Sequence, residues 1–355
     1  MLFAYTYVPH QMEKMQEFID FIFEVWCRAP IGTEFKLDLF DEKPELQAIL
    51  SQFGFENNAP ERGKKFYQEI KGIYELFAEL KPPHIEQFKH WYQSNNNIEC
   101  ACSNTGGSQI ARYADIQAHY PEINKLLESF FKNLYSADLL GLKALKDAIG
   151  ELDNHYKVLM KANKFGKCPF CGINDMKGEH HNRREAYDHY LPKGLYPFNS
   201  INLRNLAPAC HDCNSAYKHT KDLMYNEVGR RKAFYPYSTT AYTIKLTVNL
   251  REDTHIDQLE PEHIEVVLHS DGCNEEIEAW REVYGIDERY KAKCCSLDAR
   301  VWLEEVRMMR DKGTDPLSWL STIQQVADYA PFANSYFLKT AFLEGYKQVG
   351  ILDEI

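Results

Sequence analysis

The sequence predicts an α+β protein in three parts: a mostly helical N-terminal region (1–163), a small central module (164–232) and a mixed, mainly helical C-terminal region (233–355). Two observations predict this division. Apolar residues recur at helical spacing through most of the first 160 residues. The central stretch is instead rich in Cys, His, Asn, Pro and Lys and shows little periodicity, which is typical of a module organised by something other than a large apolar core.

In the N-terminal region, apolar residues fall at every third or fourth position, as on the buried face of an amphipathic helix. This spacing predicts helices over 11–26, 61–80, 121–135 and 136–163, with a further helix that begins after Pro82–Pro83. The stretch 95–107 is polar and rich in turn residues, so it predicts a loop.

The C-terminal region begins with a predicted hairpin. Apolar residues alternate from Tyr242 to Leu250, which predicts a strand, and 264–268 predicts its partner. Helical spacing then predicts helices over 275–284, 287–310, 316–329 and 335–349. These C-terminal strands combined with so many helices make the predicted class α+β.

Composition and charge restrict the function. No apolar run is long enough to span a membrane, and the N-terminus lacks the pattern of a signal peptide, so we expect a cytoplasmic protein without a membrane partner. The net charge of −11 argues against loose coating of nucleic acid. Lys161 to Lys232, however, holds thirteen Lys/Arg and seven Asp/Glu, so this part carries +6 and the rest carries −17. The sequence therefore concentrates its positive charge around the central module.

Four of the ten cysteines form two C-x-x-C pairs in the central module. Cys168 and Cys171 lie in C-P-F-C-G, and Cys210 and Cys213 lie in C-H-D-C-N. Two residues between paired cysteines let both thiolates reach one ion, and two such pairs complete the tetrahedral sulfur shell that suits Zn²⁺. Because the chain is large and expected to be cytosolic, a structural zinc site is predicted in preference to disulfides.

The 38 residues between the two pairs contain the components of a hydrolytic site. Asp188 and His189 are adjacent, Asn205 follows, and Asn214 comes directly after the second cysteine pair, with Lys218 beyond it. Carboxylate and amide oxygens are ligands for Mg²⁺ (or Mn²⁺), and a neutral imidazole can take a proton from an attacking water near neutral pH. This set predicts one-metal phosphodiester hydrolysis.

The order D-H…N…C-x-x-C-N-x-x-x-K resembles the HNH endonuclease family, in its version with a four-cysteine zinc site around a ββα-metal fold. The resemblance covers roughly Cys168 to Lys221. It implies that Asp188, at the end of the first strand, and Asn214, in the first turn of the helix, bind the catalytic Mg²⁺. It also implies that His189 is the general base and that Asn205 braces the loop between the strands. The family often has His at the position of Asn214, so this chain implies a weaker Mg²⁺ site that depends more on substrate phosphate.

Basic residues flank this set. As nucleic-acid-binding residues, they would grip phosphates on either side of the scissile bond, and the alternative for each is a solvated basic face. They are Lys193, Arg204, Lys218 and Lys221.

The flanks extend the resemblance more weakly. D-H-Y-L-P-K, Ala233–Tyr237 (A-F-Y-P-Y) and Glu278–Tyr290 look like parts of HNH proteins from bacterial anti-phage systems of the Septu and retron-associated type. That likeness implies a defence effector that cuts DNA and has a protein partner such as an ATPase. Two alternatives stay open: an HNH nuclease that cuts RNA, including tRNA, and a zinc-stabilised binding module without catalysis.

Overall fold

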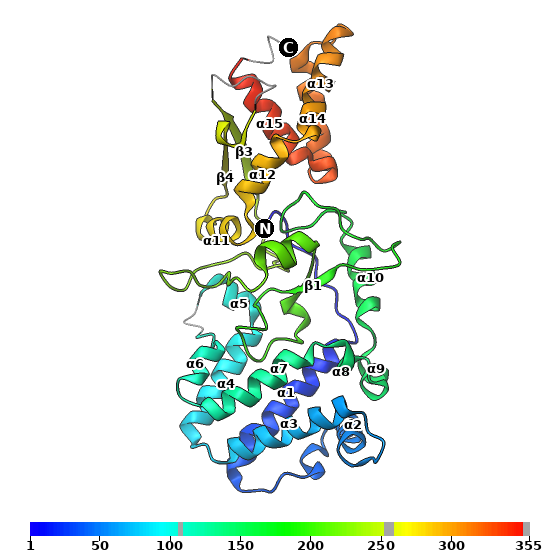
Figure 1. The fold of residues 1–355 in the computed structure, drawn as a ribbon, viewed down its shortest axis with the longest axis vertical. Helices are drawn as coiled ribbons and strands as arrows, with labels where there is room; N and C mark the ends of the chain where they lie inside the picture. The colour runs from blue at the N-terminus through cyan, green and yellow to red at the C-terminus, as the bar shows by residue number, and fades with distance from the viewer. Residues whose placement is uncertain (106–108, 252–258, 351–355) are drawn as a thin grey trace.

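The computed structural model describes residues 1–105, 109–251 and 259–350. The molecule is elongated, with the N-terminal helices at one end, the central module in the middle and the C-terminal region at the other end (Figure 1). It is mostly helical, with two small antiparallel sheets, so the predicted α+β class is confirmed. No helix in the described ranges has the length and apolar character needed to cross a membrane.

Helices build the N-terminal region around an aromatic core. The indole N–H of Trp26 donates to the carbonyl of Ile70 at 3.0 Å, and the rings of Phe66 and Phe130 stack 5.6 Å apart. Proline at the first turn begins three of these helices, where its missing N–H costs nothing. The helices are α1 (Glu13–Arg28), α2 (Pro44–Phe55), α3 (Glu61–Ala78), α4 (Pro82–Asn96), α5 (Ile98–Ser103), α6 (Tyr113–Gln117), α7 (Pro121–Leu134), α8 (Ala137–Leu140), α9 (Lys143–Ile149) and α10 (Leu152–Ala162).

Two predictions in this region were wrong. The stretch 136–163 is three short helices instead of one, because a glycine ends each of the first two: Gly141 ends α8 and Gly150 ends α9. Gly150, with φ +75°, takes a conformation that other residues rarely adopt. The predicted loop 95–107 contains α5, where the Asn97 side chain accepts from the backbone N–H of Cys100 and so caps the helix. Residues 106 and 107 of that prediction lie outside the described residues.

The central module contains a short hairpin followed by a helical turn. Strand β1 (Ala186–His189) pairs with β2 (Leu206–Ala209) so that Asp188 lies opposite Ala207 and His189 opposite Leu206. The single turn η3 (Leu203–Asn205) leads into β2, and the π-helical segment η4 (Asp212–Lys218) follows it.

In the C-terminal region, β3 (Lys245–Leu250) pairs with β4 (Ile264–His269), and β4 alternates buried and exposed residues. Helix α15 (Tyr336–Gln348) crosses β3 so closely that a Cβ on Gly345 would lie 2.3 Å from the Val248 carbonyl oxygen. The predicted helix 287–310 is divided in two at Cys295–Ser296. The helices are α11 (Asn274–Tyr284), α12 (Ile286–Cys294), α13 (Leu297–Asp311), α14 (Pro316–Tyr329) and α15 (Tyr336–Gln348).

Buried apolar side chains form two cores. One lies among α1 to α4 and α6 to α9 and receives Phe198 and Ile201 from the loop between β1 and β2. The other is shared by the central module, the C-terminal region, α5, α10 and the first residues of the chain. The central module therefore lacks a core of its own and is held between both ends of the molecule.

Candidate active site

The four paired cysteines come together at one point. Their sulfur atoms all lie within 4.8 Å of one another, and all four residues are buried. Cys168 and Cys171 lie in a tight turn closed by the backbone N–H of Gly172 on the Cys168 carbonyl at 2.7 Å. Cys210 follows β2, and Cys213 lies in the first turn of η4. The four residues can hold one metal ion, and a shell of four sulfurs fits structural zinc.

Several donors point at these sulfur atoms. The Arg289 guanidinium donates to Cys213 Sγ at 3.1 Å, and the Asn174 amide donates to Cys210 Sγ at 3.4 Å. The backbone N–H of Cys213 also donates to Cys210 Sγ, at 3.5 Å. Such donors stabilise thiolates, the form of cysteine that binds a metal.

The C-terminal region supplies part of this support. Trp280 on α11 donates to the Phe170 carbonyl at 2.6 Å, and Tyr290 on α12 donates to the Cys171 carbonyl at 3.0 Å. Sequence reasoning singled out 278–290 but did not connect it with the cysteines. No local spacing could have shown the contact, because Trp280 is 110 residues from Phe170.

Asp188 lies at the end of β1 and is buried against Lys218. The Lys218 ammonium donates to Asp188 Oδ1 at 2.8 Å and to the His189 carbonyl at 2.8 Å. The second carboxylate oxygen, Oδ2, is buried and has no hydrogen-bond partner among the described residues. Burial raises the pKa of Asp188, and the positive charge of Lys218 opposes that rise.

The π-helical winding of η4 explains how Lys218 reaches Asp188. The N–H of His219 donates to the Asn214 carbonyl at 3.0 Å, five residues back. In an α-helix, Cys213 and Lys218 would point about 140° apart. The wider π turn brings residues five apart closer to one face, and both side chains are buried. Asn214, which the resemblance implies is a metal ligand, is half-buried next to Cys213 in η4.

His189 is partly buried by its neighbours. Its Nε2 is 3.0 Å from the Ser200 carbonyl, and its ring meets the Tyr135 ring edge-on with centroids 4.7 Å apart. Burial lowers the pKa of His189 to about 3, helped by the positive charges of Lys193 and Lys218. The imidazole is therefore neutral at pH 7, and a proton on Nε2 that donates to Ser200 leaves the lone pair on Nδ1.

Asn205 ties the base of the loop that joins β1 to β2. Its side-chain oxygen accepts from the Leu191 N–H at 2.8 Å, and its amide donates to the carbonyls of Leu191 at 3.1 Å and Asn199 at 3.2 Å. Its own carbonyl accepts from the Tyr190 N–H at 2.8 Å. These contacts fix the chain directly after His189, where the resemblance placed a bracing residue.

The flanking basic residues differ from one another in placement. Lys218 is buried in the ion pair, so the expectation that it faces a phosphate at the surface is corrected. Lys193 is partly buried and donates to the carbonyls of Lys132 at 3.2 Å and Tyr135 at 3.4 Å. Arg204 is exposed with its guanidinium 4.1 Å from the centroid of the Tyr7 ring, and Lys221 is exposed.

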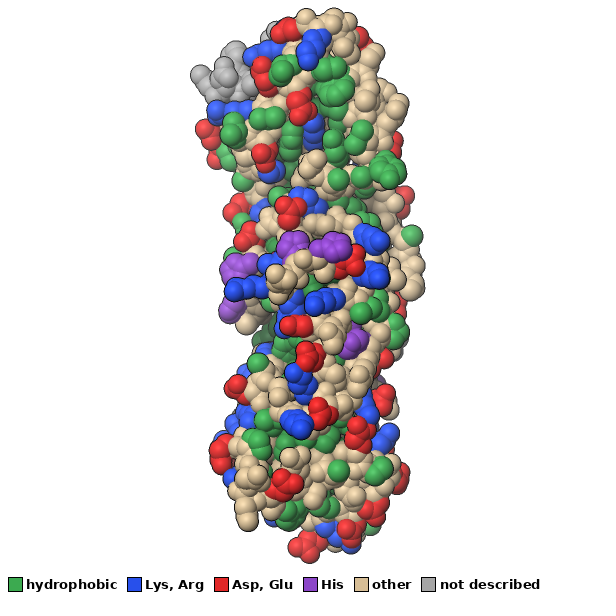
Figure 2. Space-filling model, turned by 90° about the vertical axis from the view of Figure 1, so that its right-hand side faces the viewer, with side chains coloured by type: hydrophobic (Ala, Val, Ile, Leu, Met, Phe, Trp, Pro, Cys, Tyr) green, Lys and Arg blue, Asp and Glu red, His purple; other side chains and the backbone are tan. Residues whose placement is uncertain are grey.

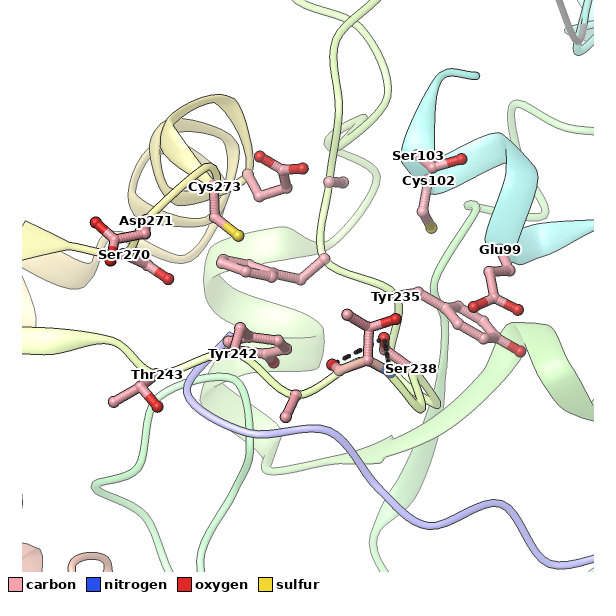
Figure 3. Close-up of a pocket in the computed structure, with 15 residues that line it drawn as sticks. Glu99, Cys102, Ser103, Tyr235, Ser238, Tyr242, Thr243, Ser270, Asp271 and Cys273 are labelled. Carbon is pink, nitrogen blue, oxygen red and sulfur yellow. Dashed lines mark hydrogen bonds between the residues drawn. The ribbon is translucent and has the colours of Figure 1, made fainter. Parts of the chain in front are cut away.

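A separate cavity of about 570 Å³ lies where α5, the segment 233–243 and the start of α11 meet. Figure 3 shows Cys102 and Tyr235 on one side of it and Cys273 and Tyr242 on the other. None of the predicted site residues lines this cavity. The candidate active site is therefore the hairpin with η4 and the cysteine cluster.

In comparisons with known proteins, no family model, curated protein or solved structure matches the chain.

Proposed function

We propose that this chain is a metal-dependent endonuclease of the HNH kind that hydrolyses phosphodiester bonds in DNA. The observation that best supports the proposal is the contact of η4 with the end of β1, where Lys218 reaches Asp188 and the His189 carbonyl. Asp188 has a buried carboxylate oxygen without a partner, His189 is neutral with a lone pair on Nδ1, and Asn214 follows a cysteine of the metal cluster.

The residues divide the chemistry among them. Asp188 Oδ2 and the Asn214 amide oxygen would hold Mg²⁺ or Mn²⁺, which supplies charge stabilisation to the transferring phosphate. His189 accepts the proton of the attacking water at Nδ1 while Nε2 stays bonded to Ser200. A phosphate anion nearby favours the protonated imidazole and offsets the lowering of its pKa by burial. Asn205 keeps the loop, and with it His189, in place.

The test is cleavage of supercoiled plasmid with Mg²⁺ or Mn²⁺ by the wild type and by His189→Ala. Cutting by the wild type alone, with zinc content and circular dichroism unchanged in the variant, is the expected result. His180→Ala is the matched control, because the side chain of His180 is 92% exposed and makes no contact with the site residues. A His189→Ala protein that cuts as well as the wild type would remove the mechanism.

One observation favours a second candidate, a zinc-stabilised binding module without catalysis. The Lys218 ammonium already neutralises the Asp188 carboxylate, so a metal ion would have to compete with Lys218 for this ligand. This candidate predicts no binding of Mn²⁺ at the hairpin. Electron paramagnetic resonance of Mn²⁺ titrated into the wild type and into Asp188→Asn separates the two, because only the nuclease proposal predicts binding that the substitution weakens.

The substrate and partner are parts of the same proposal. Comparing cleavage of duplex DNA, single-stranded DNA and RNA by one preparation separates a DNase from an RNase. We propose that the N-terminal helical region, which reaches the candidate site through Tyr135, contacts a protein partner such as an ATPase in an anti-phage system. We expect the full chain to co-purify with that partner. Substitutions on the surface of the N-terminal helices should abolish the co-purification.

A further inference from the structure

Helix α10 packs one face against β1 and turns the other to solvent. Its inner face contacts the strand through His155, whose Nδ1 is 2.7 Å from the Tyr187 hydroxyl. Tyr156 reaches the loop before β1 by donating to the Lys177 carbonyl at 2.5 Å. The outer face carries Lys157 and Lys161, with Lys164 directly beyond the helix, and all three are exposed.

The positive charge on this face has little acidic compensation. The acidic residues of the neighbouring chain have partners: Asp153 with Arg184 at 2.6 Å, Asp175 with Lys167 at 2.6 Å, and Glu185 with Lys177 at 2.5 Å. Three lysines and one arginine remain with no carboxylate within 4.0 Å among the described residues. They are Lys157, Lys161, Lys164 and Arg183, and together they are called the α10 basic face.

Figure 2 looks onto this side of the molecule, and Lys, Arg and His side chains gather across its middle third, while acidic side chains are more frequent toward the lower end. The concentration agrees with the excess positive charge of residues 161–232 against the negative remainder of the chain. A polyanion approaching an overall acidic protein is attracted to such a surface and repelled elsewhere.

We propose that the α10 basic face binds the phosphate backbone of duplex DNA beside the candidate active site. The ligand rests on the proposed function, and the placement rests on the packing of α10 against β1, the strand that ends in Asp188 and His189. The rise of an α-helix sets Lys157 and Lys161 about 6 Å apart along the axis. That separation is close to two repeats of the phosphates of one strand, whose charges recur about every 3.4 Å of the duplex axis.

Duplex DNA fits this face better than a single strand. Proteins that hold single strands stack the bases on free aromatic rings. The aromatic side chain next to Lys164 is Phe165, and its ring packs on Phe3 with centroids 4.4 Å apart and on Phe332 with centroids 5.8 Å apart. The Phe165 side chain is still 47% exposed, but a single ring already packed on two others beside four cations suits a phosphate backbone better than a row of stacked bases.

The experiment measures binding of a fluorescent 20-base-pair duplex by anisotropy without added divalent metal, at several salt concentrations. The triple variant Lys157→Gln, Lys161→Gln and Lys164→Gln should bind roughly tenfold or more weakly, and the slope of log K against log salt should become shallower by about 2.7. The matched control neutralises three exposed lysines elsewhere, none of which has a carboxylate partner among the described residues. They are Lys81, Lys125 and Lys312. Gln is a good helix former, so both sets should fold.

Each outcome decides the proposal. Unchanged binding by the triple variant, or an equal loss in the control, would overturn it, as would binding of an RNA hairpin in place of the duplex. Loss confined to the triple variant supports it even if the wild type cuts no plasmid, in which case the nuclease proposal fails alone. If the wild type cuts plasmid and the triple variant cuts with the same KM, the nuclease proposal stands and the basic face fails.

Discussion

Lys218 places a positive charge inside the candidate site. Its side chain is 1% exposed and that of Asp188 is 3% exposed, so water screens the pair little. The sequence predicted Lys218 to contact phosphate because it flanks the Asp-His-Asn-Asn set at the end of the motif. The π-helical winding of η4, which no residue spacing revealed, turns it inward.

Replacing Lys218 by Met should leave the Asp188 carboxylate buried without a counter-charge. We expect the free energy of unfolding to fall by about 3–5 kcal/mol, measured by chemical denaturation of the zinc-loaded protein. The double variant Asp188→Asn with Lys218→Met should recover most of the loss, because neither charge remains. Lys221→Met is the exposed control and should change stability by less than about 0.5 kcal/mol. Full stability of Lys218→Met would show that the pair contributes nothing.

His155 makes stability depend on pH. It is fully buried between α10 and β1, and burial lowers its pKa from 6.5 to about 4. Between these values only the unfolded chain takes up the proton, so stability is complete above pH 6.5 and declines as pH falls toward 4. The decline should reach about 3 kcal/mol in total.

The measurement compares the free energy of unfolding at pH 7.5 and pH 5 for the wild type and for His155→Gln. Gln can still accept from the Tyr187 hydroxyl but does not titrate, so the variant should lose less stability on acidification. Equal losses in both proteins would assign the pH dependence to other groups.

At the scale of elements, α12 acts on the cysteine cluster through Arg289. The guanidinium donates to Cys213 Sγ and lies over the Tyr217 ring at 4.6 Å, which holds it in place. A positive donor offsets part of the negative charge that four thiolates leave on a bound Zn²⁺.

Arg289→Met should therefore weaken zinc retention by roughly 10–100-fold. The measurement is the rate and extent of zinc transfer to a coloured chelator. Arg281→Met is the matched control, because Arg281 on α11 pairs with Asp287 and Glu278 and donates to no cysteine. Equal zinc transfer from both variants would show that the contact between Arg289 and Cys213 does not contribute to zinc retention.

Elements defined by local spacing were largely predictable. The limits of α3, α14, β3 and β4 agree with prediction within a few residues, because periodic apolar residues face one core. The breaks at Gly150 and Ser296 were missed, since apolar spacing continues across them.

The candidate site was predictable only where its residues are close in the chain. The two cysteine pairs and the adjacency of Cys213 and Asn214 could be read directly from the sequence. The four cysteines do cluster in the structure. The partners that enclose them come from distant segments: Arg289 on α12 and Tyr135 after α7. Such contacts follow from packing, which spacing within one sequence does not encode.

At the scale of the whole molecule, the metal cluster joins parts that are far apart in the chain. The N–H of Leu2 donates to the Pro169 carbonyl at 2.9 Å, and α11 and α12 donate to the same knuckle. Removing zinc should therefore loosen more than the two cysteine turns.

Hydrogen–deuterium exchange before and after zinc chelation measures this directly. Uptake should rise at both cysteine pairs and in α11 and α12, while α1, α3 and α7, which belong to the other core, should change little. A rise confined to the cysteine turns would mean that the C-terminal helices hold their position without the metal.

The contact between Tyr135 and His189 has a consequence for control of the site. The corner between α7 and α8 lies against the imidazole, and Lys193 fastens that corner by donating to the carbonyls of Lys132 and Tyr135. The imidazole is partly exposed, so the position of this corner sets how much of the ring a substrate phosphate can reach. Displacement of this corner by a partner bound to the N-terminal helices would expose more of the imidazole, which links those helices to the chemistry at His189.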